Sequence, residues 1–177
     1  MPRRSILSAA ERASLLLPPD TEDELIRHYA FGETDLSLIR QRRGDANRLG
    51  VAVQLCLLRF PGQGLLPDAS MPMSLLQWIG RQLRIDPSCW PQYAEREETR
   101  REHLLELRAY LGVEPFGLAH YRQAVHATTE LALQTDKGIV LAVNVLDTLR
   151  HRHIIIPALD VIERVCAEAI TRANRRI

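Results

Sequence analysis

The sequence is poor in the residues on which several classes of protein depend. Lys137 is the only lysine among 23 basic residues, and aromatic residues make up 5% of the chain. The three cysteines, Cys56, Cys89 and Cys166, lie far apart. They form neither a disulfide framework nor a metal-binding spacing, so a reduced, cytosolic protein is expected. No apolar run approaches the ~20 residues that a membrane span needs, which argues against a membrane protein.

The sequence also lacks the motifs of common catalytic sites. Neither a phosphate-binding GxxxxGK[ST] loop nor a metal-binding HExxH helix is present. His151 and His153 are two residues apart and have no supporting carboxylate or cysteine nearby. Glu98 and Glu102 form a carboxylate pair on an arginine-rich segment, where a solvated ion-pair face is the simpler interpretation. We therefore expect no catalytic residue, no metal site and no cofactor in this chain.

The spacing of apolar residues predicts an all-α fold. Helices are expected over about 8–17, 21–29, 34–42, 46–59, 74–83, 87–93, 95–111, 118–134 and 137–152, and from 157 onward. The helix over 46–59 is apolar on most of its surface and is expected to be buried. Within 137–152 the residues expected to face inward are Ile139, Ala142, Val143, Leu146 and Leu149. The proline- and glycine-rich segment 61–72 is predicted to be a loop.

The predicted helices group into two small units with helix–turn–helix-like elements. The boundary is expected near residue 90, which gives one unit over 1–92 and another over 93–177. The last helix shows no stop signal before Ile177. A piece of a longer protein is therefore expected.

The charge of the chain is balanced, since 23 basic and 22 acidic residues give a net charge of +1. Any anion binding must therefore come from local patches. The densest patch precedes the buried helix and consists of Arg40, Arg42, Arg43 and Arg48, with Asp45 as the nearby acid. Arginines at a helix start are typical of contacts to a nucleic-acid backbone. A solvated basic loop is the alternative that the sequence leaves open.

Further segments carry side chains suited to DNA. Arg3 and Arg4 form an N-terminal arm of the kind that enters minor grooves. The other candidates are Asn47 beside the basic turn, Arg96, Arg100 and Arg101 on the charged helix, His120, Arg122 and Gln123 in the first turns of the helix after Gly117, and Lys137. A recognition helix presents such side chains, although an ordinary exposed helix face is the alternative. Because 46–59 lacks an exposed polar face, its arginines are expected to contact phosphates while bases are read elsewhere.

Several long segments of the chain resemble one protein family. They are MPRRSILSAAER, DELIRHY, DLSLIRQRRGDANRLGVAVQLCLLRFPG, TRREHLLEL, HYRQAVHATTELALQTDKGIVLA and PALDVIERVCAEAITRANRRI. Together they cover nearly the whole chain apart from the stretch 62–92. They resemble the N-terminal region of the Tn-three family transposases, the TnpA-type enzymes of replicative bacterial transposons.

The resemblance implies a region that binds double-stranded DNA at the terminal inverted repeats of a transposon. It implies a longer parent protein with an RNase-H-like catalytic domain nearer the C-terminus, and a homodimer formed through that parent. The expected location is the bacterial cytoplasm, in association with the nucleoid. The alternative function is that of a helical scaffold for protein interaction or dimerisation. The near-zero net charge and the acidic residues interleaved with arginine favour it. A stand-alone enzyme is the weakest alternative, because no catalytic constellation is present.

Overall fold

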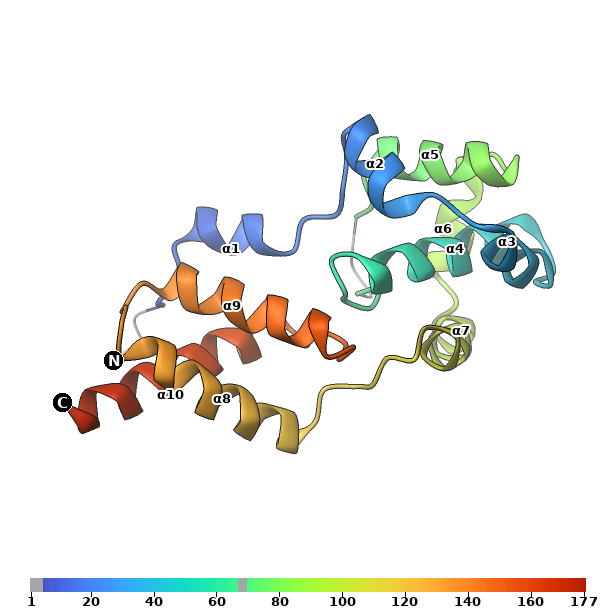
Figure 1. The fold of residues 1–177 in the computed structure, drawn as a ribbon. Coiled ribbons are helices and arrows are strands. Elements are labelled where there is room, and N and C mark those ends of the chain that lie inside the picture. The colour runs from blue at the N-terminus through green and yellow to red at the C-terminus, as the bar shows by residue number, and fades with distance from the viewer. Residues whose placement is uncertain (1–4, 67–69) are drawn as a thin grey trace. The chain divides into compact units, whose positions relative to one another are not determined.

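A computed structural model describes residues 5–66 and 70–177 of the chain, apart from the side chain of residue 94. Within these residues the fold consists of ten α-helices and one short 3-10 helix, which confirms the predicted all-α class (Figure 1). The arm residues Arg3 and Arg4 lie outside the described residues, as does the part 67–69 of the predicted loop.

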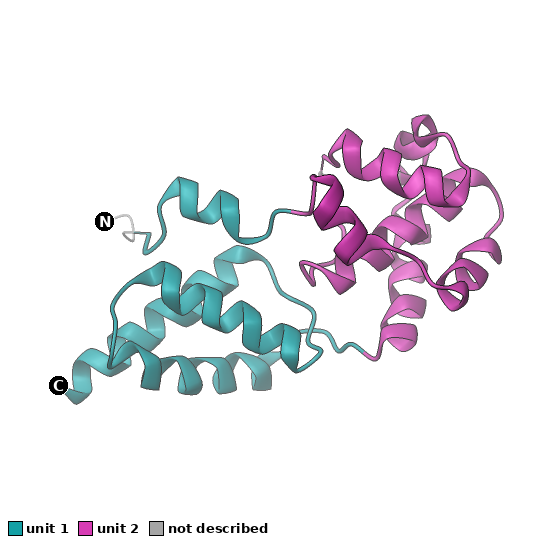
Figure 2. Cartoon of the chain, turned by 45° about the horizontal axis from the view of Figure 1, so that its top comes forward, with its two compact units in different colours: residues 1–17, 113–177 teal, residues 18–112 magenta. Residues whose placement is uncertain are grey.

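The helices belong to two compact units, which Figure 2 shows in different colours. Unit 2 comprises residues 18–112, and unit 1 combines residues 1–17 with 113–177. These boundaries differ from the expected division between 92 and 93 in two respects. The helices over 90–94 and 97–111 pack on the centre of unit 2, and the first helix belongs with the last three. The first unit along the chain is thus interrupted by the second.

Unit 2 is built around one central helix. Its elements are α2 (Glu22–Tyr29), α3 (Glu33–Arg40), α4 (Asp45–Arg59), α5 (Met73–Leu83), η1 (Pro87–Cys89), α6 (Trp90–Ala94) and α7 (Glu97–Leu111). All the other elements of the unit pack against α4, and every residue from Leu49 to Leu58 is buried. The predicted burial of this helix is therefore confirmed. Gly50 lets α6 approach closely, because a Cβ atom there would lie 2.2 Å from the ring of Tyr93.

The start of α4 depends on a glycine. Gly44 is the N-cap residue and has φ 83° and ψ 150°, a conformation that is essentially confined to glycine. Asp45 is the first helical residue. The sharp turn at Gly44 lets the chain reverse direction within the four residues 41–44 between α3 and α4.

A buried carboxylate joins three helices of unit 2. Asp35 accepts hydrogen bonds from Arg59 of α4 at 2.8 and 2.7 Å, and from the hydroxyl of Tyr110 of α7 at 2.6 Å. It also accepts the backbone N–H of Gly32, at the start of its own helix, at 3.1 Å. Arg59 foremost, with Tyr110 and Gly32, holds the pKa of Asp35 down at about 2.

A second buried polar group lies between α4, α6 and α7. The Gln54 side chain donates to the Tyr93 hydroxyl at 2.6 Å and to the Arg100 carbonyl at 3.1 Å. The Tyr93 hydroxyl lies 2.9 Å from Nδ1 of His103. The tautomer of the His103 ring decides which of the hydroxyl and Nδ1 donates in this hydrogen bond. Burial, and then the charge of Arg42, lowers the pKa of His103 to about 4.

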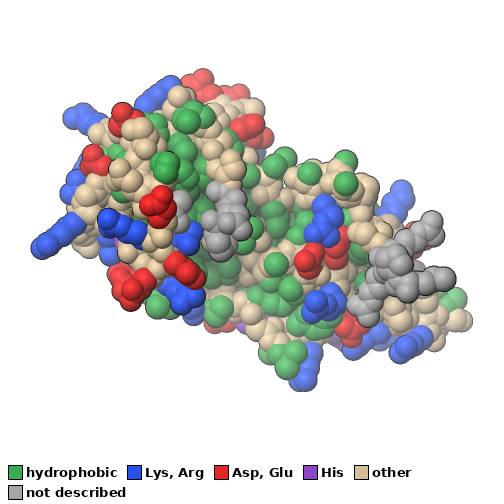
Figure 3. Space-filling view, turned by 180° about the vertical axis from the view of Figure 1, so that it is seen from behind, with side chains coloured by type: hydrophobic (Ala, Val, Ile, Leu, Met, Phe, Trp, Pro, Cys, Tyr) green, Lys and Arg blue, Asp and Glu red, His purple; other side chains and the backbone are tan. Residues whose placement is uncertain are grey.

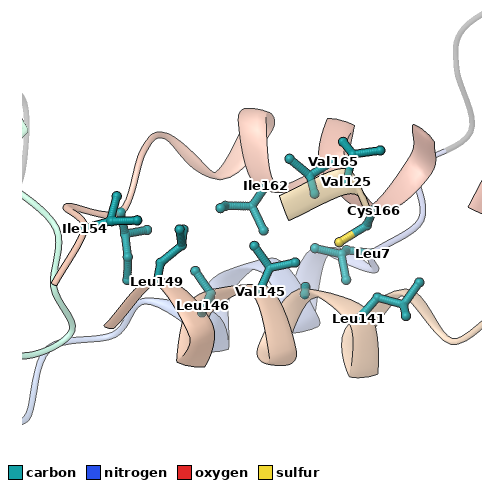
Figure 4. Close-up of a cluster of buried hydrophobic side chains, with 12 residues drawn as sticks. Leu7, Val125, Leu141, Val145, Leu146, Leu149, Ile154, Ile162, Val165 and Cys166 are labelled. Carbon is teal, nitrogen blue, oxygen red and sulfur yellow. The ribbon is translucent and has the colours of Figure 1, made fainter. Parts of the chain in front are cut away.

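Unit 1 is a bundle of α8 (Leu118–Ala132), α9 (Gly138–His151) and α10 (Leu159–Arg176), joined by α1 (Ala9–Leu15). In Figure 4 the side chains of Leu141, Val145, Leu146 and Leu149 point from α9 toward Ile162, Val165 and Cys166 of α10. Leu7, just before α1, enters the same cluster. The N-terminal segment is also held by Ser8, whose side chain caps α1, and by Arg12, which pairs with Asp160 and Glu163.

The inward side of α9 is only partly the predicted one. Ala142, Leu146 and Leu149 are buried, but Val143 is 42% exposed, so its predicted inward position was wrong. Leu141 and Val145 are buried instead. Seven of the eight residues 139–146 are apolar, so the helical spacing of apolar residues did not indicate which side of α9 faces the core.

We predict that the free energy of unfolding of unit 2 falls as the pH falls from 6.5 to about 4. The unfolded chain protonates His103 near pH 6.5, whereas the folded chain does so near 4, so unfolding takes up a proton in this window. The expected loss is about 3 kcal/mol. Asp35 should cause a further loss between about 3.8 and 2. Urea unfolding followed by tryptophan fluorescence measures this, since Trp78 and Trp90 both lie in unit 2.

A His103→Gln variant is the control for this pH dependence, because it removes the titrating ring. Its stability should fall much less between pH 6.5 and 4, and the remaining loss should come from His28, whose pKa burial also lowers. An equal loss in the variant would show that another group causes the pH dependence.

Candidate nucleic-acid interface

The predicted basic turn is the connection from α3 to α4, residues 41–44, with Arg40 and Arg48 on either side. The backbone here is held without a side-chain cap on α4, because the N-cap residue is Gly44. The first N–H groups of α4 thus lack a side-chain acceptor, and a helix start of this kind attracts anions. The exposed carboxylate of Asp45 lies at the same end and offsets part of this field.

Two of the four arginines of the turn are engaged within the protein. Arg48 donates from Nε to the carbonyl of Arg42 at 2.9 Å and from a terminal nitrogen to that of Arg40 at 3.4 Å. These are orphan carbonyls at the C-terminal end of α3 and the residues after it, so Arg48 caps that helix. Arg42 forms an ion pair with Glu106 of α7. These two side chains therefore fix the turn in place.

The other two arginines are free. Arg40 and Arg43 are exposed, and neither side chain has a hydrogen bond or ion pair with any residue that the structure describes. Asn47 is half-buried and donates its amide to the carbonyl of Arg43 at 3.0 Å, while its Oδ1 atom has no partner among the described residues. The structure thus brings two unpaired guanidinium groups to one rigid turn.

The candidates on α7 are separated in role. Arg101 pairs with Glu97 one turn earlier, and both side chains are largely exposed. Arg100 is half-buried, and its Nε atom lacks a partner within the described part of the chain. Arg96 is the exposed N-cap residue of α7. The three arginines therefore differ in exposure and in partners, and they do not form one uniform basic surface.

The candidates on α8 are mostly engaged as well. His120 accepts the N–H of Gly117 at 2.9 Å through Nδ1, and its Nε2 lies 3.6 Å from Glu114. Its ring therefore serves as the cap of α8. Gln123 accepts a hydrogen bond from Arg152 at 2.8 Å. Arg122 remains exposed without a partner in the described residues, and so does Lys137 at the start of α9.

Two arginines that the sequence analysis passed over are equally free. Arg81 and Arg84, near the end of α5, are exposed and line a surface hollow with Gln77 and Ile85. The signal was their spacing of three residues at the end of a helix that itself contains no acid, although Asp86 follows and lines the same hollow. On the face shown in Figure 3, cationic and anionic side chains are interspersed and do not gather into one large patch of either sign. The free cations are therefore local features, as the net charge requires.

Comparisons with known proteins identify the family. The family model described as "Domain of unknown function (DUF4158)" matches residues 6–169. The chain belongs to this family. It is 63% identical to the transposase for transposon Tn3926 of Escherichia coli and 58% identical to that for transposon Tn501 of Pseudomonas aeruginosa. Each match covers 100% of the chain and 18% of the relative.

The predicted resemblance to the N-terminal region of the Tn-three family transposases is confirmed by these matches. The transposase for transposon Tn21 of Escherichia coli, at 60% identity over the same share of its length, supports the same assignment. The chain thus spans about a fifth of the length of the curated transposases that it matches. In the part of this DUF4158 chain that the structure describes, no helix has both the length and the hydrophobicity of a membrane span.

We predict that the arginines of the turn separate into structural and free groups by their effect on folding. Arg48→Ala should lower the free energy of unfolding of unit 2 by about 1–2 kcal/mol, because two carbonyls lose a charged donor. Arg43→Ala should change it by less than about 0.5 kcal/mol. Urea unfolding followed by tryptophan fluorescence measures both. Equal effects would mean that Arg48 does not cap α3.

Proposed function

We propose that this chain is a part of a transposase that binds double-stranded DNA at the terminal inverted repeats of its transposon. The observation that carries the proposal is the pair of unpaired, exposed arginines, Arg40 and Arg43, at the uncapped start of α4. Guanidinium groups and helix N-termini are the groups with which proteins contact phosphates. The similarity to the transposases for transposons Tn3926 and Tn501 supports this assignment.

The geometry suits phosphate contact better than base reading at this turn. The turn is held by Arg48 and Arg42, so binding has to order the side chains of the two free arginines but not the backbone that carries them. The helix that follows is buried from Leu49 to Leu58 and has no exposed side to place in a groove. The turn therefore holds the DNA backbone and sets the register.

We infer further that the chain alone neither cuts nor joins DNA and needs no cofactor. On this view the catalytic chemistry belongs to an RNase-H-like domain in the longer transposase, which also forms any homodimer. The protein would act in the bacterial cytoplasm, at the nucleoid.

A protein-interaction scaffold is the second candidate function. It is favoured by the arginines that are already paired with acids, such as Arg101 with Glu97 and Arg176 with Glu130. Exposed apolar side chains, among them Ile26 and Met73, also suit a protein partner. A scaffold would dimerise or bind a partner while showing no salt-dependent affinity for DNA.

We predict that changing Arg40 and Arg43 together to alanine weakens DNA binding equally for specific and scrambled duplexes. Loss of two phosphate contacts should reduce the slope of log K against log salt concentration by about 1.8. Fluorescence anisotropy with a duplex of the element's own terminal inverted repeat, across a salt series, measures this slope.

The matched control changes two arginines that are paired with acids, Arg172 and Arg176, to alanine. It alters the net charge by the same amount and should keep the wild-type slope. If both double variants change the slope alike, the turn is not a phosphate site. If the wild-type chain does not prefer the repeat over the scrambled duplex, the proposed end recognition is wrong.

A further inference from the structure

Helix α9 presents a continuous side that no other element covers. Its exposed residues recur at helical spacing along the side opposite the core, and they are Val140, Val143, Asn144, Asp147, Thr148 and His151. Val140 and Val143 are 43% and 42% exposed. The opposite side supplies Leu141, Val145, Leu146 and Leu149 to the core, as Figure 4 shows. We call the six exposed residues the α9 face.

The centre of the α9 face carries no unpaired charge. Its one acid, Asp147, is paired with Arg150 at 3.0 Å. Positive charge lies at both ends instead: Lys137 is exposed at the N-cap, and Arg152 follows the last turn and donates to Gln123 of α8. A neutral strip between two cationic ends complements a groove whose floor is neutral and whose walls are anionic.

The side chains of the α9 face match the chemistry of base edges. Asn144 has a side-chain amide with no hydrogen bond among the described residues, so its donor and acceptor are both available. An amide of this kind can contact N6 and N7 of adenine together. The valines offer methyl groups that suit the C5-methyl group of thymine. Thr148 donates its hydroxyl to the carbonyl of Asn144 at 2.8 Å, so its oxygen remains an acceptor.

The exposed sides of the other two helices carry more side chains that are charged or already engaged. In the first turns of α8, where the sequence suggested base reading, His120 accepts the N–H of the N-cap residue Gly117 and Gln123 accepts a bond from Arg152. Arg122 is the exposed candidate there without a partner in the described residues, and it suits a phosphate better than a strip of bases. The exposed side of α10 carries ion pairs such as Arg172 with Glu168.

We propose that the α9 face lies in the major groove of double-stranded DNA and reads bases through Val140, Val143 and Asn144. The inference rests on the proposed function and assigns base reading to a helix that the sequence had not indicated. The helix is about 20 Å long at ~1.5 Å per residue, and the major groove, about 12 Å wide, admits one α-helix. DNA is the partner that this charge pattern indicates, because the α9 face is neutral in the middle and has cationic residues at its ends.

The test compares two asparagines on exposed helix positions. Asn144→Ala should reduce the preference for the repeat over a scrambled duplex by about five- to a hundredfold, since one bidentate base contact is lost. Its salt slope should stay at the wild-type value, because no phosphate contact is removed. Asn174→Ala, on the exposed side of α10, is the matched control and should change neither quantity.

A thymine-to-uracil scan of the repeat tests the valines independently. Uracil lacks only the C5-methyl group, so wild-type affinity should fall several-fold at one or more positions. At those positions Val140→Ala or Val143→Ala should bind the thymine and uracil duplexes equally. Circular dichroism should show unchanged helicity, because both side chains are exposed.

The outcomes separate the inference from the proposed function. If the wild-type chain prefers the repeat and Asn144→Ala retains that preference in full, the α9 face does not read bases, while end recognition stands. If the α9 variants instead change only the oligomeric state, measured by light scattering, the face is a protein interface and the inference is wrong. If the wild-type chain has no preference, both proposals fail together.

Discussion

The ion pair between Asp35 and Arg59 is the interaction on which unit 2 depends. One carboxylate receives four donors, from the start of its own helix α3, from the end of α4 and from α7. A buried charge of this kind is costly unless every lone pair is satisfied, and here nearly all of them are. Removing Arg59 would leave the Asp35 carboxylate buried without its cationic partner. The Asp35–Arg59 contact joins the start of α3 to the end of α4, which are the ends of these helices away from the turn. It therefore helps to position the turn between them.

Arg48 completes this arrangement from the other end of α4. It lies eleven residues before Arg59 on the same helix side, and it binds the carbonyls that end α3. Two arginines of α4 thus hold α3 at both its ends. The remaining arginines of the turn, Arg40 and Arg43, are free because these roles are already filled. Phosphate contact by unit 2 and base reading by α9 in unit 1 would then be separate tasks of separate units.

The sequence predicted the helices and most of the core because those depend on local spacing. The helix ranges and the burial of the helix ending at Arg59 follow from patterns within one segment. The roles of the arginines could not be predicted in the same way. Arg48 binds backbone carbonyls, which have no sequence signature, and Arg42 finds Glu106 in a helix 64 residues away.

Two further features depend on tertiary contacts. Val143 was expected inside because residues 139–146 are nearly all apolar, so the packing of α10 decides which side is buried. His120 and Gln123 were expected to be available because their partners, Gly117 N–H and Arg152, are set by the helix start and by tertiary structure. Whether any of the candidate residues contacts DNA stays a prediction.

The interrupted order of the chain has a consequence for its synthesis. Leu7 and Arg12 bind residues that follow them by more than a hundred positions, so these early residues must wait for partners that are synthesised much later. Unit 2 contains only residues 18–112 and can complete its core while the rest is still on the ribosome. Unit 1 closes afterwards around an N-terminal segment already tethered to a folded body. Such tethering shortens the search for that contact, since the folded insert brings the two distant segments of unit 1 closer than an unfolded chain of the same length would.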